Sequence, residues 1–141
     1  MNMSNARQDF YGAILDTAVA GGINYWASVY CYRQGISAAL ITHEESTVGE
    51  NEFHPRQTHE AVGAMDFDGM GYEAHHIPVD LGTVRRGWNI FAKDPNITNR
   101  YALQALSDAR NGDLESAACN IDAGLADVIV QMGIYGKIKF A

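Results

Sequence analysis

Five histidines are the residues best suited to metal chemistry in this chain, and several carboxylates lie near them in the sequence. A zinc site needs three or four such side chains at a spacing that lets them face one ion. The sequence has no H-E-x-x-H or C-x-x-C pattern, and neighbouring histidines in a strand would point to opposite faces. We therefore interpret the histidines as solvated, expect no cofactor or metal, and keep a metal-dependent hydrolase as the last alternative. The histidines are His43, His54, His59, His75 and His76.

Motifs for nucleophilic catalysis and for phosphate binding by glycine loops are also missing. The sequence has no G-x-S-x-G, no Walker pattern and no dinucleotide-binding glycine pattern. Cys31 and Cys119 are the two cysteines, and neither lies in a catalytic signature. We expect both to be reduced and structural. The sequence therefore offers no catalytic residue and favours a non-enzymatic function.

Two small groups of side chains could instead bind a ligand. Arg85 and Arg86 form the one compact basic patch, and guanidinium groups bind phosphate or carboxylate through paired hydrogen bonds. Tyr30 and Tyr32 share a face of a predicted strand with Trp26, and an aromatic face can stack on a base or join a protein interface. The alternatives are a solvated helix face for the arginines and packing on a helix for the aromatics. We favour packing for Trp26.

The segment 43–59 is a third candidate for binding. It is polar, lacks apolar periodicity and is long for a connection, so we expect an exposed and functional loop. Its glutamates outnumber its single arginine. An acidic loop is suited to steering toward a basic partner surface, and salt weakens that attraction. The glutamates are Glu44, Glu45, Glu50 and Glu52.

The elements that must position these residues follow from the spacing of apolar side chains. An apolar stripe of period near 3.6 predicts a first helix, capped by Ser4 or Asn5. Gly21-Gly22 should end that helix through a residue at positive φ. A strand over 25–33 follows, and it is predicted to form a hairpin with 37–42.

The rest of the chain predicts more strands and then a group of helices. Asp68-Gly69 is a hairpin turn between two strands, Pro78 should end the second of them, and Asp80 is placed to cap a helix. The resulting order is helix, four strands, three helices and one strand, which predicts an α+β fold with an antiparallel sheet. The predicted elements are strands 60–67 and 71–77, helices 81–92, 97–110 and 123–132, a turn at 114–119, and a closing strand 137–140.

Length and composition favour one globular domain over residues 1–141, with residues 1–6 disordered. The net charge of −7 opposes general binding to nucleic acid. No apolar run reaches the ~20 residues of a membrane helix, and the first residues lack the apolar core of a signal peptide. We therefore expect a cytoplasmic protein.

The same apolar spacing predicts which side chains form the core. The predicted core consists of Ile14, Leu15, Ala18, Trp26, Val29, Leu81, Val84, Leu106, Leu125, Val128 and Ile129.

The closing strand 137–140 is apolar and short, so it should be an edge that needs a neighbour. We therefore expect a homodimer or a larger homo-oligomer.

The stretches GGINYWASV and NIDAGLADVIVQMGIYGKIKFA resemble small uncharacterised accessory proteins of tailed phages and prophage-bearing bacteria. The resemblance covers the two ends of the chain and not the segment 43–76. It implies a phage accessory protein and carries over no catalytic residue. We expect a non-enzymatic protein that binds and blocks a host or defence protein, in the host cytoplasm if it is phage-encoded. The alternative is a protein that sequesters a signalling nucleotide through the tyrosines and arginines.

Overall fold

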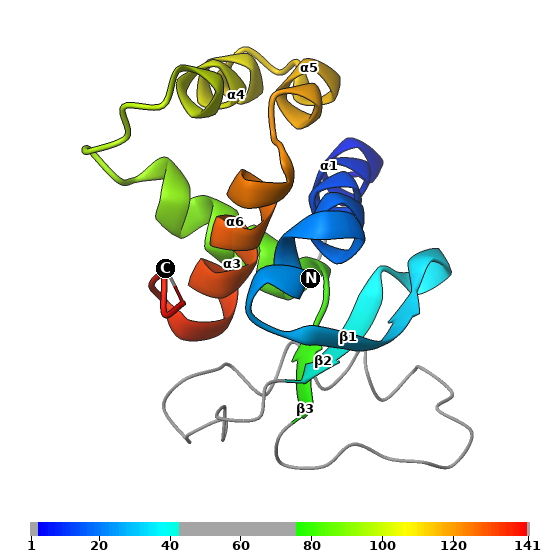
Figure 1. The fold of residues 1–141 in the computed structure, drawn as a ribbon. Helices are drawn as coiled ribbons and strands as arrows, with labels where there is room; N and C mark the ends of the chain where they lie inside the picture. Colours follow the sequence, from blue (N-terminus) through cyan, green and yellow to red (C-terminus); the bar gives the residue numbers. More distant parts are fainter. Residues whose placement is uncertain (1–2, 43–75, 141) are drawn as a thin grey trace.

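The computed structural model describes residues 3–42 and 76–140. Helices pack above a small antiparallel sheet, with α1, α3 and α6 together at the centre (Figure 1). This confirms the α+β class, whereas the predicted order with five strands is not matched. The predicted strand 60–67 and most of the strand 71–77 lie outside the described residues. The elements are α1 (Asn5–Thr17), β1 (Ser28–Arg33), β2 (Ala38–Thr42), β3 (His76–Val79), α3 (Leu81–Ala92), α4 (Arg100–Arg110), α5 (Leu114–Cys119) and α6 (Ala123–Tyr135).

The first helix begins as its cap predicts and ends in a different way. The Ser4 side chain accepts a hydrogen bond from the Arg7 backbone N–H, and α1 starts at Asn5, inside the stretch expected to be disordered. The helix then continues as one π-helical turn, Ala18–Gly22. Neither Gly21 nor Gly22 has a positive φ, and that of Gly22 is −83°, so the predicted positive φ is wrong.

Close packing explains the glycine at position 22. A Cβ there would lie 2.3 Å from the carbonyl oxygen of Ala123, at the start of α6. No side chain fits at that distance, so Gly22 is needed for contact between two backbones rather than for a turn.

The sheet has the order β1-β2-β3, and both pairs are antiparallel. The predicted hairpin between β1 and β2 is confirmed. Pro78 does not end the last strand as predicted: it lies inside β3, opposite Leu40. Among the described residues β3 is an edge strand, where a residue without an N–H is tolerated.

The aromatic strand face that the sequence predicts does not form. Trp26 precedes β1 and lies at the end of a 3-10 turn. The register between β1 and β2 shifts between Val29 and Cys31, so Tyr30 is the extra residue of a bulge. A bulge interrupts the alternation of side chains, and Trp26, Tyr30 and Tyr32 therefore do not share one face.

Helix α3 has the predicted bounds because its signals are local. The Asp80 carboxylate accepts from the Thr83 backbone N–H at 3.0 Å, and the Thr83 hydroxyl oxygen accepts from the Asp80 N–H at 3.2 Å. This is a complete capping box. Helix α4 is capped by Asn99 and starts three residues later than expected, and the predicted turn at 114–119 is the helix α5.

The closing strand 137–140 is a wrong prediction. Helix α6 runs to Tyr135 and ends at Gly136, which has a φ of 75°. The segment that follows is not a strand, and a side chain of α6 binds its backbone. The Gln131 Oε1 atom accepts from the N–H groups of Lys139 at 3.0 Å and Phe140 at 2.8 Å. The edge that motivated a homo-oligomer is therefore absent, and the oligomeric state stays a prediction.

The predicted core is confirmed for most residues. Ile14, Leu15, Ala18, Trp26, Val84, Leu106 and Ile129 are buried. The other four, Val29, Leu81, Leu125 and Val128, are half-buried. In the part of the chain that the structure describes, no helix is both long enough and apolar enough to cross a bilayer.

Candidate functional site

The structure separates the two arginines that the sequence grouped. Arg86 is half-buried, and its Nη2 atom donates to the carbonyl oxygen of Ile134 at 3.4 Å. Burial lowers the pKa of Arg86, and the nearby charge of Asp80 opposes that shift. Arg85, by contrast, lines a hollow between α1 and α3. The pair therefore does not form one anion site.

The two tyrosines are also placed apart from Arg85. The Tyr32 hydroxyl donates to the carboxylate of Asp16 on α1. Burial and then that carboxylate raise the pKa of Tyr32. Tyr30 is 46% exposed at the bulge of β1. Neither tyrosine lines the hollow that contains Arg85.

The remaining predicted site residues lie outside the described residues. This holds for Glu44, Glu45, Glu50 and Glu52, and for the histidines His43, His54, His59 and His75. Only the backbone of His76 is described, in β3. Within residues 3–42 and 76–140, no three His, Cys, Asp or Glu side chains are grouped so that they could hold a metal ion.

Helix α6 presents a surface that the sequence interpretation did not find. Its sequence contains no Lys, Arg or Glu, and its one aspartate, Asp127, is buried. Two hollows of about 430 and 360 Å³ open along the helix, and both are lined by Gly124 and Val128, so they adjoin. We call this surface the α6 groove. Its apolar and glycine lining residues are Gly21, Gly22, Tyr25, Phe91, Ile97, Tyr101, Ala102, Gly124, Leu125, Val128, Ile138 and Phe140, and its polar ones are Thr98, Asn99, Asn120, Asp122, Asp127 and Gln131.

The walls of the α6 groove carry most of the exposed large apolar side chains. Tyr25 is 64% exposed, Tyr101 56% and Ile138 45%. The other two exposed large apolar residues in the described part of the chain, Tyr30 and Leu103, lie outside the groove. Leu125 and Val128 are half-buried along the bottom. The groove is therefore an apolar surface open to water, which is typical of binding sites.

A buried hydrogen-bond network fixes one end of the α6 groove. The Trp26 Nε1–H donates to Asp127 at 2.6 Å, and the Gln131 side chain donates to the same carboxylate at 2.9 Å. Burial raises the pKa of Asp127, while these two hydrogen bonds act in the opposite direction. The Trp26 ring also stacks on Phe140, with 4.8 Å between ring centroids. Because these contacts hold the wall in place, this end of the groove is already formed before a ligand arrives.

Comparison with known proteins finds no matching family model, no matching curated protein and no matching solved structure. The resemblance to phage accessory proteins stays a prediction from the two ends of the chain. The candidate site therefore rests on geometry alone. One sequence signal for it does exist, because α6 contains a single charged residue, Asp127, whereas a helix with one buried face should carry several charges on the other.

Proposed function

We propose that the protein acts by binding another protein through the α6 groove, and not by catalysing a reaction. The observation that carries this proposal is the open face of α6 along Gly124, Leu125 and Val128, which lies between the exposed side chains of Tyr25, Tyr101 and Ile138; the charged lining residues are Asp122 at the helix start and the buried Asp127. The central parts of protein interfaces are depleted of charge and enriched in aromatic residues. Leaving such a surface in water is unfavourable, and a partner that covers it removes that cost.

The shape of the groove indicates the kind of partner. It follows one helix and has apolar walls at both ends. An amphipathic helix that inserts apolar side chains at helical spacing fits such a surface. The resemblance to phage proteins favours a host or defence protein in the host cytoplasm as this partner.

The alternatives have less support from the described residues. Sequestering a nucleotide through Tyr30, Tyr32, Arg85 and Arg86 would need these side chains together, and they lie at separate places. The buried carboxylates of Asp80 and Asp127 are occupied in a helix cap and in the network with Trp26. The acidic segment 43–59 and four of the five histidines lie outside the described residues, so a docking role for the loop stays a prediction.

The test is affinity capture from the bacterial host, with mass spectrometry of the bound proteins. We would compare the wild type with Val128→Lys in the groove and with Leu103→Lys, a matched change at an exposed leucine that lies outside the groove. We expect the wild type and Leu103→Lys to capture the same protein and Val128→Lys to lose it. Circular dichroism would check that all three are folded.

Two results would overturn the proposal. One is equal capture by the wild type and Val128→Lys. The other comes from light scattering: if the wild type is a dimer and Val128→Lys a monomer, then the groove is covered by a second copy of the chain. In that case the predicted homo-oligomer would be confirmed, and the groove would not be free for another protein.

A further inference from the structure

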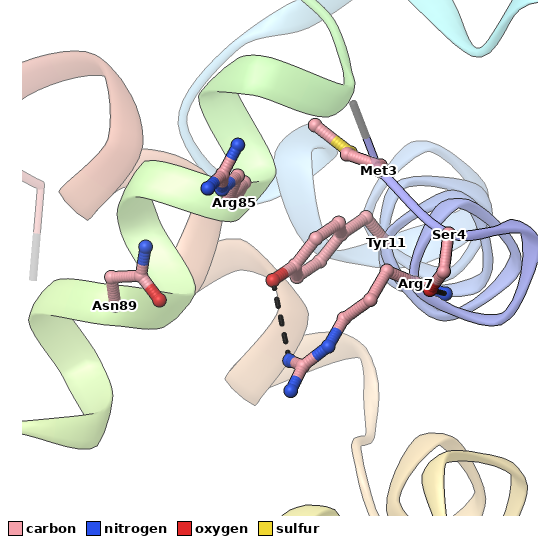
Figure 2. A pocket seen from close by; sticks show the side chains of 6 residues that line it. All are labelled: Met3, Ser4, Arg7, Tyr11, Arg85 and Asn89. Carbon is pink, nitrogen blue, oxygen red and sulfur yellow. Dashed lines mark hydrogen bonds between the residues drawn. The ribbon is translucent and has the colours of Figure 1, made fainter. Parts of the chain in front are cut away.

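A separate hollow of about 340 Å³ lies between α1 and α3. Figure 2 shows that one side comes from the start of α1 and the other from two residues one turn apart on α3. None of its residues lines the α6 groove. The lining residues are Met3, Ser4, Arg7, Tyr11, Arg85 and Asn89.

The hollow contains two positive charges and no negative one among its lining residues. The Arg7 Nη1 atom donates to the Tyr11 hydroxyl oxygen at 3.5 Å, which is a long and weak hydrogen bond. Arg85 makes no hydrogen bond or ion pair with the described part of the chain. Two guanidinium groups in one hollow repel each other, and an anion between them would remove that repulsion.

The other polar groups in the hollow can donate hydrogen bonds as well. Tyr11 is only 3% exposed, so packing fixes the position of its hydroxyl, which accepts from Arg7 and keeps its own proton to donate. The Ser4 oxygen accepts from the Arg7 backbone, and its proton is also available. The amide of Asn89 adds two more donors. The hollow thus offers several hydrogen-bond donors beside two positive charges.

We propose that this hollow binds the phosphate group of a small phosphorylated molecule. A phosphate monoester carries up to two negative charges and several acceptor oxygens, so it matches two guanidinium groups better than a carboxylate does. A long nucleic acid is a poorer match, because the net charge of −7 repels a polyanion while a small anion needs only the local field. This inference does not depend on the α6 groove.

The test is titration of the full chain with inorganic phosphate, followed by calorimetry and by NMR of the backbone and side-chain amides. The variants are Arg7→Gln and Arg85→Gln, with Arg110→Gln as the control, since Arg110 is exposed at the end of α4. We expect either hollow variant to weaken phosphate binding about tenfold or more, as for a lost charge-assisted hydrogen bond. The control should change it less than about twofold.

Three results would overturn the inference. The first is the absence of saturable binding by the wild type into the millimolar range. The second is an equal loss of phosphate affinity in all three variants, which would mean that phosphate binding depends only on the net charge of the protein. The third is tighter binding of acetate than of phosphate. NMR of the wild type gives an independent reading, because the Asn89 side-chain amide should shift on titration even if a variant folds poorly.

Discussion

Two faces of helix α6 have similar chemistry and very different surroundings. On one, the helix meets α3 so closely that a Cβ on Gly133 would lie 2.1 Å from the Thr83 carbonyl oxygen. On another, Leu125 and Val128 stay half-exposed in the α6 groove. Apolar side chains therefore do not by themselves identify the core face of this helix. Small residues identify it better, because a helix can approach another closely only where side chains are missing.

The largest expected effect is at the crossing of α3 and α6. A Cβ on Gly87 would lie 1.8 Å from the Ile129 carbonyl oxygen, and backbone atoms cannot move aside easily. We expect Gly87→Ala and Gly133→Ala each to lower the free energy of unfolding by about 3 kcal/mol or more. Urea denaturation measures this loss. Gly35→Ala is the matched control, since nothing lies within 4 Å of its added Cβ, and a loss of similar size there would show that the crossing is not special.

The second prediction compares neighbouring residues on the two faces. Ile129 is fully buried and Val128 half-buried. Ile129→Ala should cost about 2–5 kcal/mol of the free energy of unfolding, whereas Val128→Ala should cost less than about 1 kcal/mol. The midpoints of denaturant unfolding would measure both losses, provided that the dependence of the unfolding free energy on denaturant concentration stays the same. Equal costs would mean that the groove face belongs to the core.

The third prediction concerns the helix that α6 packs against. The capping box of Asp80 and Thr83 fixes the first turn of α3, and the carbonyl oxygen of Thr83 is the atom that Gly133 approaches. Asp80→Ala should lower the free energy of unfolding by about 1–2 kcal/mol, and Asp80→Asn, which can still cap, by less. Thermal unfolding measures the difference. If both variants lose the same amount, the cap is not what fixes this turn.

The smallest expected effect is a pH dependence from Asp127, beside the groove. Burial raises the pKa of this carboxyl in the folded protein, so the folded state binds the proton more tightly than the unfolded state does. Its contribution to stability is therefore full below the unfolded pKa of about 3.9 and is lost as pH rises through the folded pKa. The difference in unfolding free energy between the wild type and Asp127→Asn should fall over that range, as measured by urea denaturation at each pH. A difference that stays constant would contradict the prediction.

Local signals account for what the sequence predicted well. The bounds of α3 follow from a cap, apolar spacing and the Asp94-Pro95 stop, and all three lie within a few residues of the helix. The β1–β2 hairpin likewise needs only a short turn between two strands. The predictions that failed depend on distant neighbours. Gly22 is required by the start of α6, and the closing segment is bound by Gln131 instead of by a strand.

For the candidate sites too, the sequence predicted what depends on local signals and missed what depends on distant contacts. Arg85 was singled out from the sequence, but its companion Arg7 was not, because it lies next to a stretch expected to be disordered and meets α3 only in the folded chain. The α6 groove was missed because Leu125 and Val128 fit a core pattern equally well. Which apolar face stays open depends on where α4 and the residues around Tyr25 pack.

The side chain of Gln131 has a consequence for the motion of residues 137–140. One carboxamide binds both backbone groups of Phe140 and the N–H of Lys139. The exchange of these two amide protons with solvent therefore requires the same local opening, in which Gln131 releases the segment. The backbone amide protons of Lys139 and Phe140 should then exchange at one shared rate, although neither residue belongs to a helix or strand. The same rare opening would release the wall that Ile138 and Phe140 give to the α6 groove, which these hydrogen bonds otherwise hold in place.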